Sequence, residues 1–223
     1  MTFSPEWETL YAGGAHFIEW PWSNVITWVT RFQNTKSEET RVIELGCGTG
    51  TNAPFFFAKS MDYAAIDGSG SAIHAARERF PDRRDRFAVA DFTKEIPYPG
   101  TFDLIVERAA VSHNPTEDIR RCLGLAFERL KPGGHYIGLD WFSTAHSEYN
   151  GGQQLGDAYT RTAYDGDSFA FANCGTVHFS DEDHLTDLFS AFEIVFLQHN
   201  ARTHMIPDRG YNLATWDIVA KRP

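Results

Sequence analysis

The chain has 223 residues, of which 42% are hydrophobic and 22% charged, a composition typical of a globular protein rather than a disordered or fibrous one. Thirty acidic residues against 20 basic ones give a net charge of −10, which repels phosphate backbones and anionic lipids, so we expect neither nucleic acid nor a membrane as a partner. Three cysteines without a CxxC pair exclude a disulfide framework and a thiolate zinc site, and we predict no metal.

No segment is predicted to export the protein or to anchor it in a membrane. The beginning of the chain, MTFSPEWETLYAGG, lacks a basic stretch followed by an apolar one, and no apolar run approaches the roughly 18 residues that a membrane span needs. We therefore expect a cytoplasmic protein, a monomer or homodimer, with one domain over residues 1–223.

Short apolar runs alternate with helix-like segments through the first 140 residues. Five of these runs predict strands buried on both faces of a sheet: RVIELG (41–46), DYAAID (62–67), RFAVAD (86–91), FDLIVE (102–107) and HYIGLD (135–140). Helices are predicted over 69–80, capped by Ser69 or Ser71, and over 116–130. This alternation predicts an α/β fold with a doubly wound, mostly parallel sheet, whose ligands bind at the carboxyl ends of the strands.

The pattern changes after residue 141. Residues 143–175 are rich in glycine, serine, aspartate and aromatic residues, and we expect an insertion there. A further helix is predicted to follow a Ser180 cap, with Asp183 three residues on. Two strands, 192–198 and 214–221, then end the chain as a hairpin.

The most specific local signal is IELGCGTGTN at 43–52, a glycine-rich turn directly after a predicted strand. Gly46, Gly48 and Gly50 permit positive φ and carry no Cβ, so the backbone can approach a bound nucleoside. The dinucleotide fingerprint GxGxxG needs its third glycine at position 51, where Thr51 stands. This disfavours a nicotinamide-dependent oxidoreductase, which remains an alternative together with a non-catalytic nucleoside-binding module.

An acid followed by GxGxG, here beginning at Glu44, resembles the first motif of the class I S-adenosylmethionine-dependent methyltransferases. FDLIVERAAVSHN and RLKPGGHYIGLDWF resemble the fourth- and fifth-strand motifs of that family. The resemblance implies a seven-stranded Rossmann-like sheet with an antiparallel last strand, S-adenosylmethionine as cofactor, and methyl transfer to oxygen or nitrogen of a small-molecule acceptor. It also implies that Asp67 binds the ribose hydroxyls and that Asp91 lies where the family contacts the adenine amino group.

The predicted cofactor site consists of residues at or near these strand ends. They are Glu44, Gly46, Cys47, Gly48, Gly50, Asn52, Asp67, Gly68, Asp91, Phe92 and Glu107. Ionised carboxylates such as Asp67 and Asp91 only accept hydrogen bonds, which suits a diol and an exocyclic amine but does not suit a pyrophosphate.

Candidate bases for the acceptor's proton must lie near the carboxyl ends of the fourth and fifth strands. We rank His113 first, because a neutral imidazole can take up a proton, and a purely structural histidine is the alternative interpretation. Glu107 and Asp140 are the other catalytic candidates. The residues predicted to bind the acceptor are Tyr11, Trp22, Arg108, Trp141, His146 and Tyr149.

Two segments are expected to cover the site. Residues 1–35 resemble the cap that many small-molecule members of the family fold over the cofactor, although their aromatic side chains could simply pack in the core. Residues 143–175 are placed to form a lid, which would exclude water and set specificity. The basic run at 77–86 is interleaved with acids, and the Pro-Pro-aromatic motif of DNA amino-methylating enzymes is missing, so a small-molecule acceptor is favoured.

Overall fold

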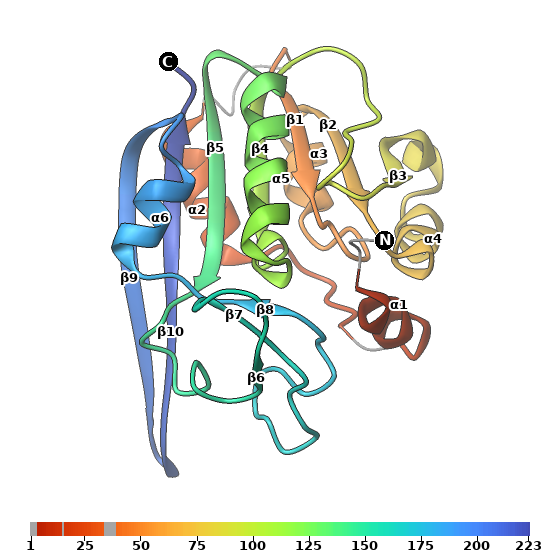
Figure 1. The fold of residues 1–223 in the computed structure, drawn as a ribbon. Helices are drawn as coiled ribbons and strands as arrows, with labels where there is room; N and C mark the ends of the chain where they lie inside the picture. The colour runs from red at the N-terminus through yellow and green to blue at the C-terminus, as the bar shows by residue number, and fades with distance from the viewer. Residues whose placement is uncertain (1–3, 15, 34–38) are drawn as a thin grey trace.

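A computed structural model of the protein describes residues 4–14, 16–33 and 39–223. In this part of the chain, a seven-stranded sheet has the order β3-β2-β1-β4-β5-β10-β9 (Figure 1). The strands are β1 (Arg41–Leu45), β2 (Asp62–Asp67), β3 (Phe87–Val89), β4 (Phe102–Arg108), β5 (Leu130–Phe142), β9 (Glu193–Met205) and β10 (Asp208–Lys221). The first five run parallel, whereas β10 is antiparallel to both β5 and β9, which confirms the predicted fold class.

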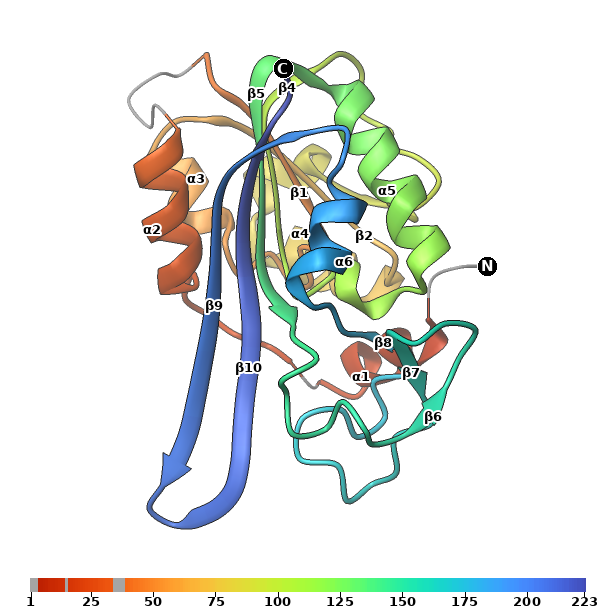
Figure 2. The same cartoon turned by 60° about the vertical axis from the view of Figure 1, so that its left-hand side comes forward.

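Helices cover both faces of the sheet, which explains why the parallel strands are apolar without alternation. One face carries α2 (Ser23–Phe32), α3 (Ala53–Ala58) and α4 (Gly70–Arg79), and the other carries α5 (Thr116–Arg129) and α6 (Glu182–Leu188) (Figure 2). The remaining helical segments are α1 (Pro5–Ala12) and the 3₁₀ turns η1 (Pro81–Arg86) and η2 (Val111–His113). No helix of the described ranges is long and apolar enough to cross a membrane.

The helix starts follow local hydrogen bonding. Ser69 caps α4 as predicted, because its Oγ accepts a hydrogen bond from the Ala72 amide at 3.0 Å. The prediction of Ser180 as the cap of α6 was wrong. Asp181 is the cap, since its side chain accepts from the His184 amide at 2.8 Å, whereas the Ser180 amide donates to the Phe142 carbonyl in an extended bridge.

The terminal hairpin is longer than the sequence pattern predicts. Its strands were expected to cover 192–198 and 214–221, but the cross-strand pairs continue outward to Met205 and Asp208. Beyond the last residue of β10 that pairs with β5, residues 201–214 form a two-stranded arm that extends past the end of the sheet (Figure 2). The arm brings β-strand side chains to the edge where ligands are expected.

The insertion folds on itself beside the same edge. Its strands, β6 (Gln153–Gln154) and β7 (Thr160–Thr162), join β8 (Val177–His178) in a small three-stranded sheet. Below them lies a small apolar cluster of Tyr164, Phe171, Cys174, Val177 and Phe179, against which Trp7 and Leu10 of α1 pack. The insertion and α1 therefore support each other across the carboxyl ends of the strands (Figure 1).

Candidate active site

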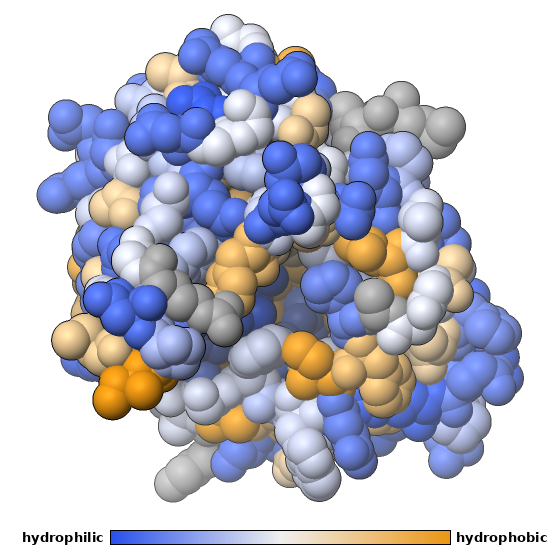
Figure 3. All heavy atoms as spheres, turned by 90° about the horizontal axis from the view of Figure 1, so that it is seen from below, coloured by the Kyte–Doolittle hydropathy of each residue, from blue (hydrophilic) through white to orange (hydrophobic). Residues whose placement is uncertain are grey.

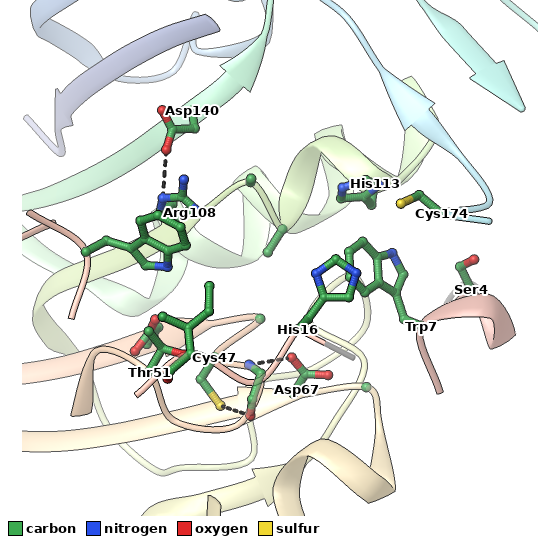
Figure 4. Close-up of a pocket in the computed structure, with 18 of the residues that line it drawn as sticks. Ser4, Trp7, His16, Cys47, Thr51, Asp67, Arg108, His113, Asp140 and Cys174 are labelled. Atoms are coloured by element: carbon green, nitrogen blue, oxygen red, sulfur yellow. Dashed lines mark hydrogen bonds and ion pairs between the residues drawn. The ribbon is translucent and has the colours of Figure 1, made fainter. Parts of the chain in front are cut away.

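A cavity of about 350 Å³ lies at the carboxyl ends of β1, β2, β4 and β5. Figure 3 looks onto this edge and shows the hollow. The strand ends form its floor, and its walls are lined by residues of α1 and the loop after it, of the segment after β4, of the insertion and of the arm. In Figure 4, Asp67, Cys47 and Thr51 lie on one side of the cavity, and Arg108, Asp140 and His113 lie opposite them.

The glycine turn after β1 is shaped by close neighbours. Gly46 has φ +68°, and a Cβ there would lie 2.2 Å from the Ala110 Cβ. Gly48 has φ +53°, and its Cβ would lie 2.6 Å from the Tyr11 hydroxyl. Both positions require glycine, since a side chain would be strained and would collide with the cavity wall. Gly50 does not line the cavity, because it packs against the rings of Phe80 and Phe87.

Asp67, at the end of β2, is held by the turn that it faces. Its Oδ2 accepts the Gly48 amide at 2.8 Å and its Oδ1 accepts the Ser69 amide at 2.9 Å. Burial raises its pKa to about 6 despite these bonds, which lower it. Each oxygen keeps a lone pair, so the carboxylate can still accept hydroxyl donors from the cavity.

Glu44 anchors the same loop from beneath. Its carboxylate accepts hydrogen bonds from the Asn52 amide at 2.8 Å and the Tyr63 hydroxyl at 2.5 Å, and burial raises its pKa to about 7. The Oδ1 atom of the Asn52 side chain in turn accepts a hydrogen bond from the Trp22 backbone amide at 3.0 Å. Thr49 has a buried hydroxyl without a protein partner among the described residues, and it lines the cavity. An unpartnered buried donor here suits a polar ligand.

Asp91, after β3, also lines the cavity with its neighbours Ala90 and Phe92. Its Oδ1 accepts the hydroxyl and the amide of Thr93, and its Oδ2 lies 2.9 Å from the Lys94 ammonium. Gly68 completes this part of the wall. The structure thus gathers nine of the predicted cofactor residues around one cavity: Glu44, Gly46, Cys47, Gly48, Asn52, Asp67, Gly68, Asp91 and Phe92.

His113 stands on the opposite wall, in η2, with its protonation state fixed by its neighbours. Its Nδ1 lies 2.9 Å from the Thr176 carbonyl, and a carbonyl only accepts, so Nδ1 carries the hydrogen and Nε2 keeps its lone pair. Trp7 and Phe142 pack edge-on against the ring. Burial lowers the pKa of His113 to about 4, so the ring is neutral at ordinary pH.

Arg108 and Asp140 form a rigid pair at the ends of β4 and β5. Arg108 Nε lies 2.7 Å from Asp140 Oδ2, and its guanidinium stacks on Trp22 at 3.6 Å from the ring centroid. Asn24 donates to the same Oδ2 at 2.9 Å, and Arg202 approaches Oδ1 at 3.5 Å. Both oxygens of Asp140 are therefore engaged with cations or amides. Tyr11, Trp22 and Arg108, predicted to bind the acceptor, and Asp140, a catalytic candidate, all line the cavity.

Glu107, a candidate for both catalysis and cofactor binding, lies behind the wall. It is fully buried, and its carboxylate accepts hydrogen bonds from the Trp141 indole and from the amides of Ala110 and Val111. Burial raises its pKa to about 7. Glu107 shapes the loop after β4 and does not line the cavity, so it contacts neither the cofactor nor the acceptor, contrary to the prediction from the sequence.

Three predicted acceptor-binding residues also lie outside the cavity wall. Trp141 is fully buried in the core beside Phe189 of α6. His146 packs within the insertion against Phe171, and Tyr149 lies there under Arg161, with its hydroxyl donating to the Ala158 carbonyl. Successive side chains of a strand point to opposite faces of the sheet, and that of Trp141 points into the core. The aromatic side chains of the insertion mostly pack against one another in a small core of their own.

Several lining residues were not predicted as site residues. They come from α1 and its following loop, from the insertion, from the arm, and from the β10 residue next to the arm: Trp7, His16, Ile18, Phe171, Cys174, Arg202, Leu213 and Thr215. The aromatic residues of α1 and the insertion had been recognised as candidates for burial. Arg202 and Leu213 carried no signal, because their segment was expected to be a loop.

Comparison with known families identifies the class of the protein. Residues 42–134 match a family model described as a methyltransferase domain. The match covers the part of the chain that carries the motifs, and it supports a class I S-adenosylmethionine-dependent methyltransferase family. The methyltransferase is therefore an enzyme whose cofactor is S-adenosylmethionine, and the nicotinamide-dependent alternative is set aside. No curated protein matches the sequence.

Solved structures share the fold of this methyltransferase at low identity. An S-adenosylmethionine-dependent methyltransferase from Methanosarcina mazei is 18% identical, with 91% of this chain and 98% of that one covered and a TM-score of 0.70. A structure from the conversion of a disulfide bond into a thioacetal group in echinomycin biosynthesis is also 18% identical, with 98% and 91% covered and a TM-score of 0.66. The N-methyltransferase NodS from Bradyrhizobium japonicum, bound to S-adenosyl-L-homocysteine, is 18% identical, with 90% and 86% covered and a TM-score of 0.59.

Proposed function

We propose that this methyltransferase methylates an oxygen or nitrogen atom of a small molecule and that His113 accepts the proton which the acceptor loses. The observation that carries the proposal is the neutral imidazole of His113, oriented by Thr176 in the wall of the cavity. An imidazole held in one tautomer, with Nε2 unprotonated, is suited to general base catalysis.

The residues opposite His113 fit the cofactor. S-adenosylmethionine supplies a methyl group on a sulfonium, which is already electrophilic and needs no metal. Asp67 would bind the ribose hydroxyls and Asp91 would face the adenine amine, while the Gly46 and Gly48 turn leaves room for the nucleoside beside it. The unpartnered hydroxyl of Thr49 offers a further hydrogen bond to the bound cofactor.

The acceptor would lie between the cofactor and the wall formed by His113, Phe142 and Phe171. The acceptor's lone pair forms a bond to the methyl carbon, the carbon–sulfur bonding pair goes to sulfur, and the acceptor's proton passes to His113 Nε2 and then to water. With a pKa of about 4, His113 is a weak base. Methylation of a hydroxyl gives a protonated ether, which is a far stronger acid than this imidazolium and can transfer its proton to Nε2. An oxygen acceptor therefore benefits most from this base. Positioning of the two reactants supplies the larger share of the rate.

The surroundings of the cavity support a small acceptor. α1, the insertion and the arm all contribute to the wall of a cavity of about 350 Å³, part of which the cofactor would fill. The proposal includes action in the cytoplasm as a monomer or homodimer, without nucleic acid. The three cysteines of the protein, Cys47, Cys122 and Cys174, are buried and form no disulfide, which suits a reducing compartment.

The proposal is tested by turnover. The purified protein should be stabilised against heat by S-adenosylhomocysteine but not by NAD, and it should form S-adenosylhomocysteine when given a panel of phenols, alcohols and amines. Methylation of a protein or nucleic acid but of no small molecule would refute the proposed acceptor class. Product analysis by mass spectrometry identifies the methylated atom.

A further inference from the structure

One face of the arm forms the end of the cavity away from α1. Arg202 pairs with Leu213 across the two strands, and Asn200 pairs with Thr215. Directly opposed residues of an antiparallel pair share a face, so all four side chains lie on the same side of the ribbon. Arg202, Leu213 and Thr215 line the cavity, and Thr215 is itself paired with Phe142 of β5.

The two arginines at this end differ in how fully they are neutralised. Arg108 lies 2.7 Å from Asp140 and is stacked on Trp22, which fixes it. Arg202 approaches the same carboxylate only at 3.5 Å, with a side chain that is 62% exposed. Asp217, the next carboxylate, is occupied by donors from Trp28, Asn200 and the Asp140 amide.

Arg202 therefore has hydrogen-bond donors to spare. A guanidinium has five N–H groups in a planar fork, and no hydrogen bond from the Arg202 side chain is found within the described residues. A cation whose donors face a cavity in this way is suited to two parallel bonds with a carboxylate.

Thr215 gives a second, independent indication of a ligand. Thr215 is 2% exposed and lines the cavity, yet its Oγ1 has no hydrogen-bond partner among the described residues. Buried hydroxyls are nearly always hydrogen-bonded, because leaving one unpaired is unfavourable. A ligand oxygen at this end of the cavity would supply the missing partner.

An aromatic path connects this end to the proposed base. Phe142 lies with its ring centroid 5.5 Å from that of His113 and 4.7 Å from that of Phe171. Phe142 of β5 is also paired with Thr215 of β10. A flat molecule that lies on Phe142 can therefore reach toward His113 at one end and toward Thr215 and the arm at the other.

We propose that Arg202 and Thr215 bind a carboxylate on the methyl acceptor, so that the substrate is a small aromatic acid with its reacting oxygen or nitrogen at the opposite end. The inference rests on the proposed function and deepens it, because it names the class of acceptor. Arg202 then acts as a specificity-determining residue that reaches the site from the arm.

The test uses three probes that differ in charge at one group: 4-hydroxybenzoate, 4-hydroxybenzamide and 4-hydroxybenzylamine. Binding to the full-length protein saturated with S-adenosylhomocysteine is measured by calorimetry. The benzoate should bind at least about tenfold more tightly than the amide, as expected for charge-assisted hydrogen bonds. In Arg202→Gln this preference should disappear, and in Thr215→Val the benzoate should bind about threefold to tenfold more weakly.

Thr203→Gln is the matched control. Thr203 follows Arg202 in the same strand, so its side chain lies on the opposite face, and it does not line the cavity. It should leave the order of the probes unchanged. Affinity for S-adenosylhomocysteine should also be unchanged in Arg202→Gln. A large loss there would overturn the proposal, since Arg202 would then hold the carboxylate of the cofactor.

Two further outcomes also overturn the proposal. One is a wild-type preference for the amine, which would assign the end of the cavity to a cation held by Asp140. The other is a preference for the benzoate that survives in Arg202→Gln. Turnover of neutral phenols or amines with either result would leave the methyltransferase proposal intact, so the two failures can be distinguished.

Discussion

The two sides of the cavity are built in different ways. The cofactor side consists of strand ends and the turns that follow them, so its contacts join residues close in the chain; Gly48 and Asp67, for example, are 19 positions apart. The acceptor side gathers Trp7 of α1, the insertion and the arm. There the Glu148 carboxylate accepts a hydrogen bond from Tyr211, 63 positions away. The comparison teaches that the first side is fixed by the sheet itself, whereas the second depends on how three peripheral segments pack together.

The chemistry of the two sides also differs. The cofactor side carries buried carboxylates, Glu44 and Asp67, whose pKa values burial raises. The acceptor side carries aromatic rings around His113, and burial lowers the pKa of that imidazole. Variants on the first side should therefore change cofactor affinity, and variants on the second should change acceptor affinity or turnover.

The largest effect is expected at His113, on the acceptor side of the cavity. His113→Ala should lower kcat about 10²- to 10⁴-fold, because it removes the only proposed acceptor for the proton. The affinity for S-adenosylhomocysteine should change little, since the imidazole lies on the acceptor side. Rapid-quench turnover at saturating substrates and calorimetry measure the two quantities.

The pH profile provides the control for this variant. With a pKa of about 4, wild-type His113 stays neutral at pH 5.5, so kcat should not fall between pH 8 and pH 5.5 through its protonation. A loss under tenfold in His113→Ala would show that the ring only packs against Trp7 and Phe142. Proximity would then carry the reaction.

The next largest effect is expected at Gly48. A side chain there is strained at φ +53° and meets the Tyr11 hydroxyl, so Gly48→Val should weaken S-adenosylhomocysteine binding at least about 100-fold. Calorimetry checks this, and circular dichroism confirms that the variant is folded. The double variant Gly48→Ala, Tyr11→Phe separates the clash from the backbone strain. Wild-type affinity in Gly48→Val would remove this turn from the cofactor site.

These two residues illustrate what sequence can predict. The parallel strands, the glycine turn and the acids at the strand ends follow from runs of residues that are local in the chain, and the structure confirms the sheet that they form. Gly50, although part of the same motif, packs against Phe80 and Phe87 instead of the cavity. A motif thus identifies the turn but does not say which of its residues faces the ligand.

The acceptor side could be predicted only in part. The segment HNARTHM (199–205) forms a mostly exposed part of β9. Its polar composition is typical of a loop, so the sequence did not indicate Arg202 as a site residue. The insertion was expected as one lid, yet Tyr149 and His146 pack inside it while Phe171 lines the cavity. Such choices depend on contacts between distant segments, which a single sequence does not specify.

A smaller effect is expected at Asp67, and it depends on pH. The pKa of about 6 means that the carboxylate is ionised at pH 8 but roughly one-tenth ionised at pH 5. Because ribose hydroxyls need an acceptor, S-adenosylhomocysteine should bind up to about tenfold more weakly at pH 5 than at pH 8. Calorimetry at several pH values checks this dependence.

Asp67→Asn is the matched variant. It keeps the shape of the side chain but removes the charge, and it should weaken binding at pH 8 by about 1 to 3 kcal/mol. It should also flatten the pH dependence in this range. If the pH dependence persists in the variant, the titrating group is another carboxylate, and Glu44, with a pKa of about 7, is the first to examine.

The smallest effect is expected at Glu148, which joins the insertion to the arm. Its carboxylate accepts hydrogen bonds from the Ser168 hydroxyl at 2.6 Å, the Phe169 and Ala170 amides at 2.9 and 3.0 Å, and the Tyr211 hydroxyl at 2.8 Å. These bonds lower its pKa, so it is ionised at neutral pH. Since Ala170 lines the cavity, this carboxylate fixes one part of the acceptor wall against the other.

Glu148→Gln keeps the size of the side chain but offers one acceptor oxygen in place of two, and its amide cannot accept from Ala170 or Tyr211. We expect the KM for the acceptor to rise about threefold to tenfold, with kcat and the affinity for S-adenosylhomocysteine nearly unchanged. Proteolytic cleavage in residues 165–171 should become faster, because the loop loses hydrogen bonds that hold it. Glu182→Gln, on an exposed helix start, serves as the control. An unchanged KM together with faster cleavage would mean that this part of the wall can open without weakening acceptor binding. The acceptor side would then not depend on the contact between the insertion and the arm, and the contrast with the cofactor side would be lost.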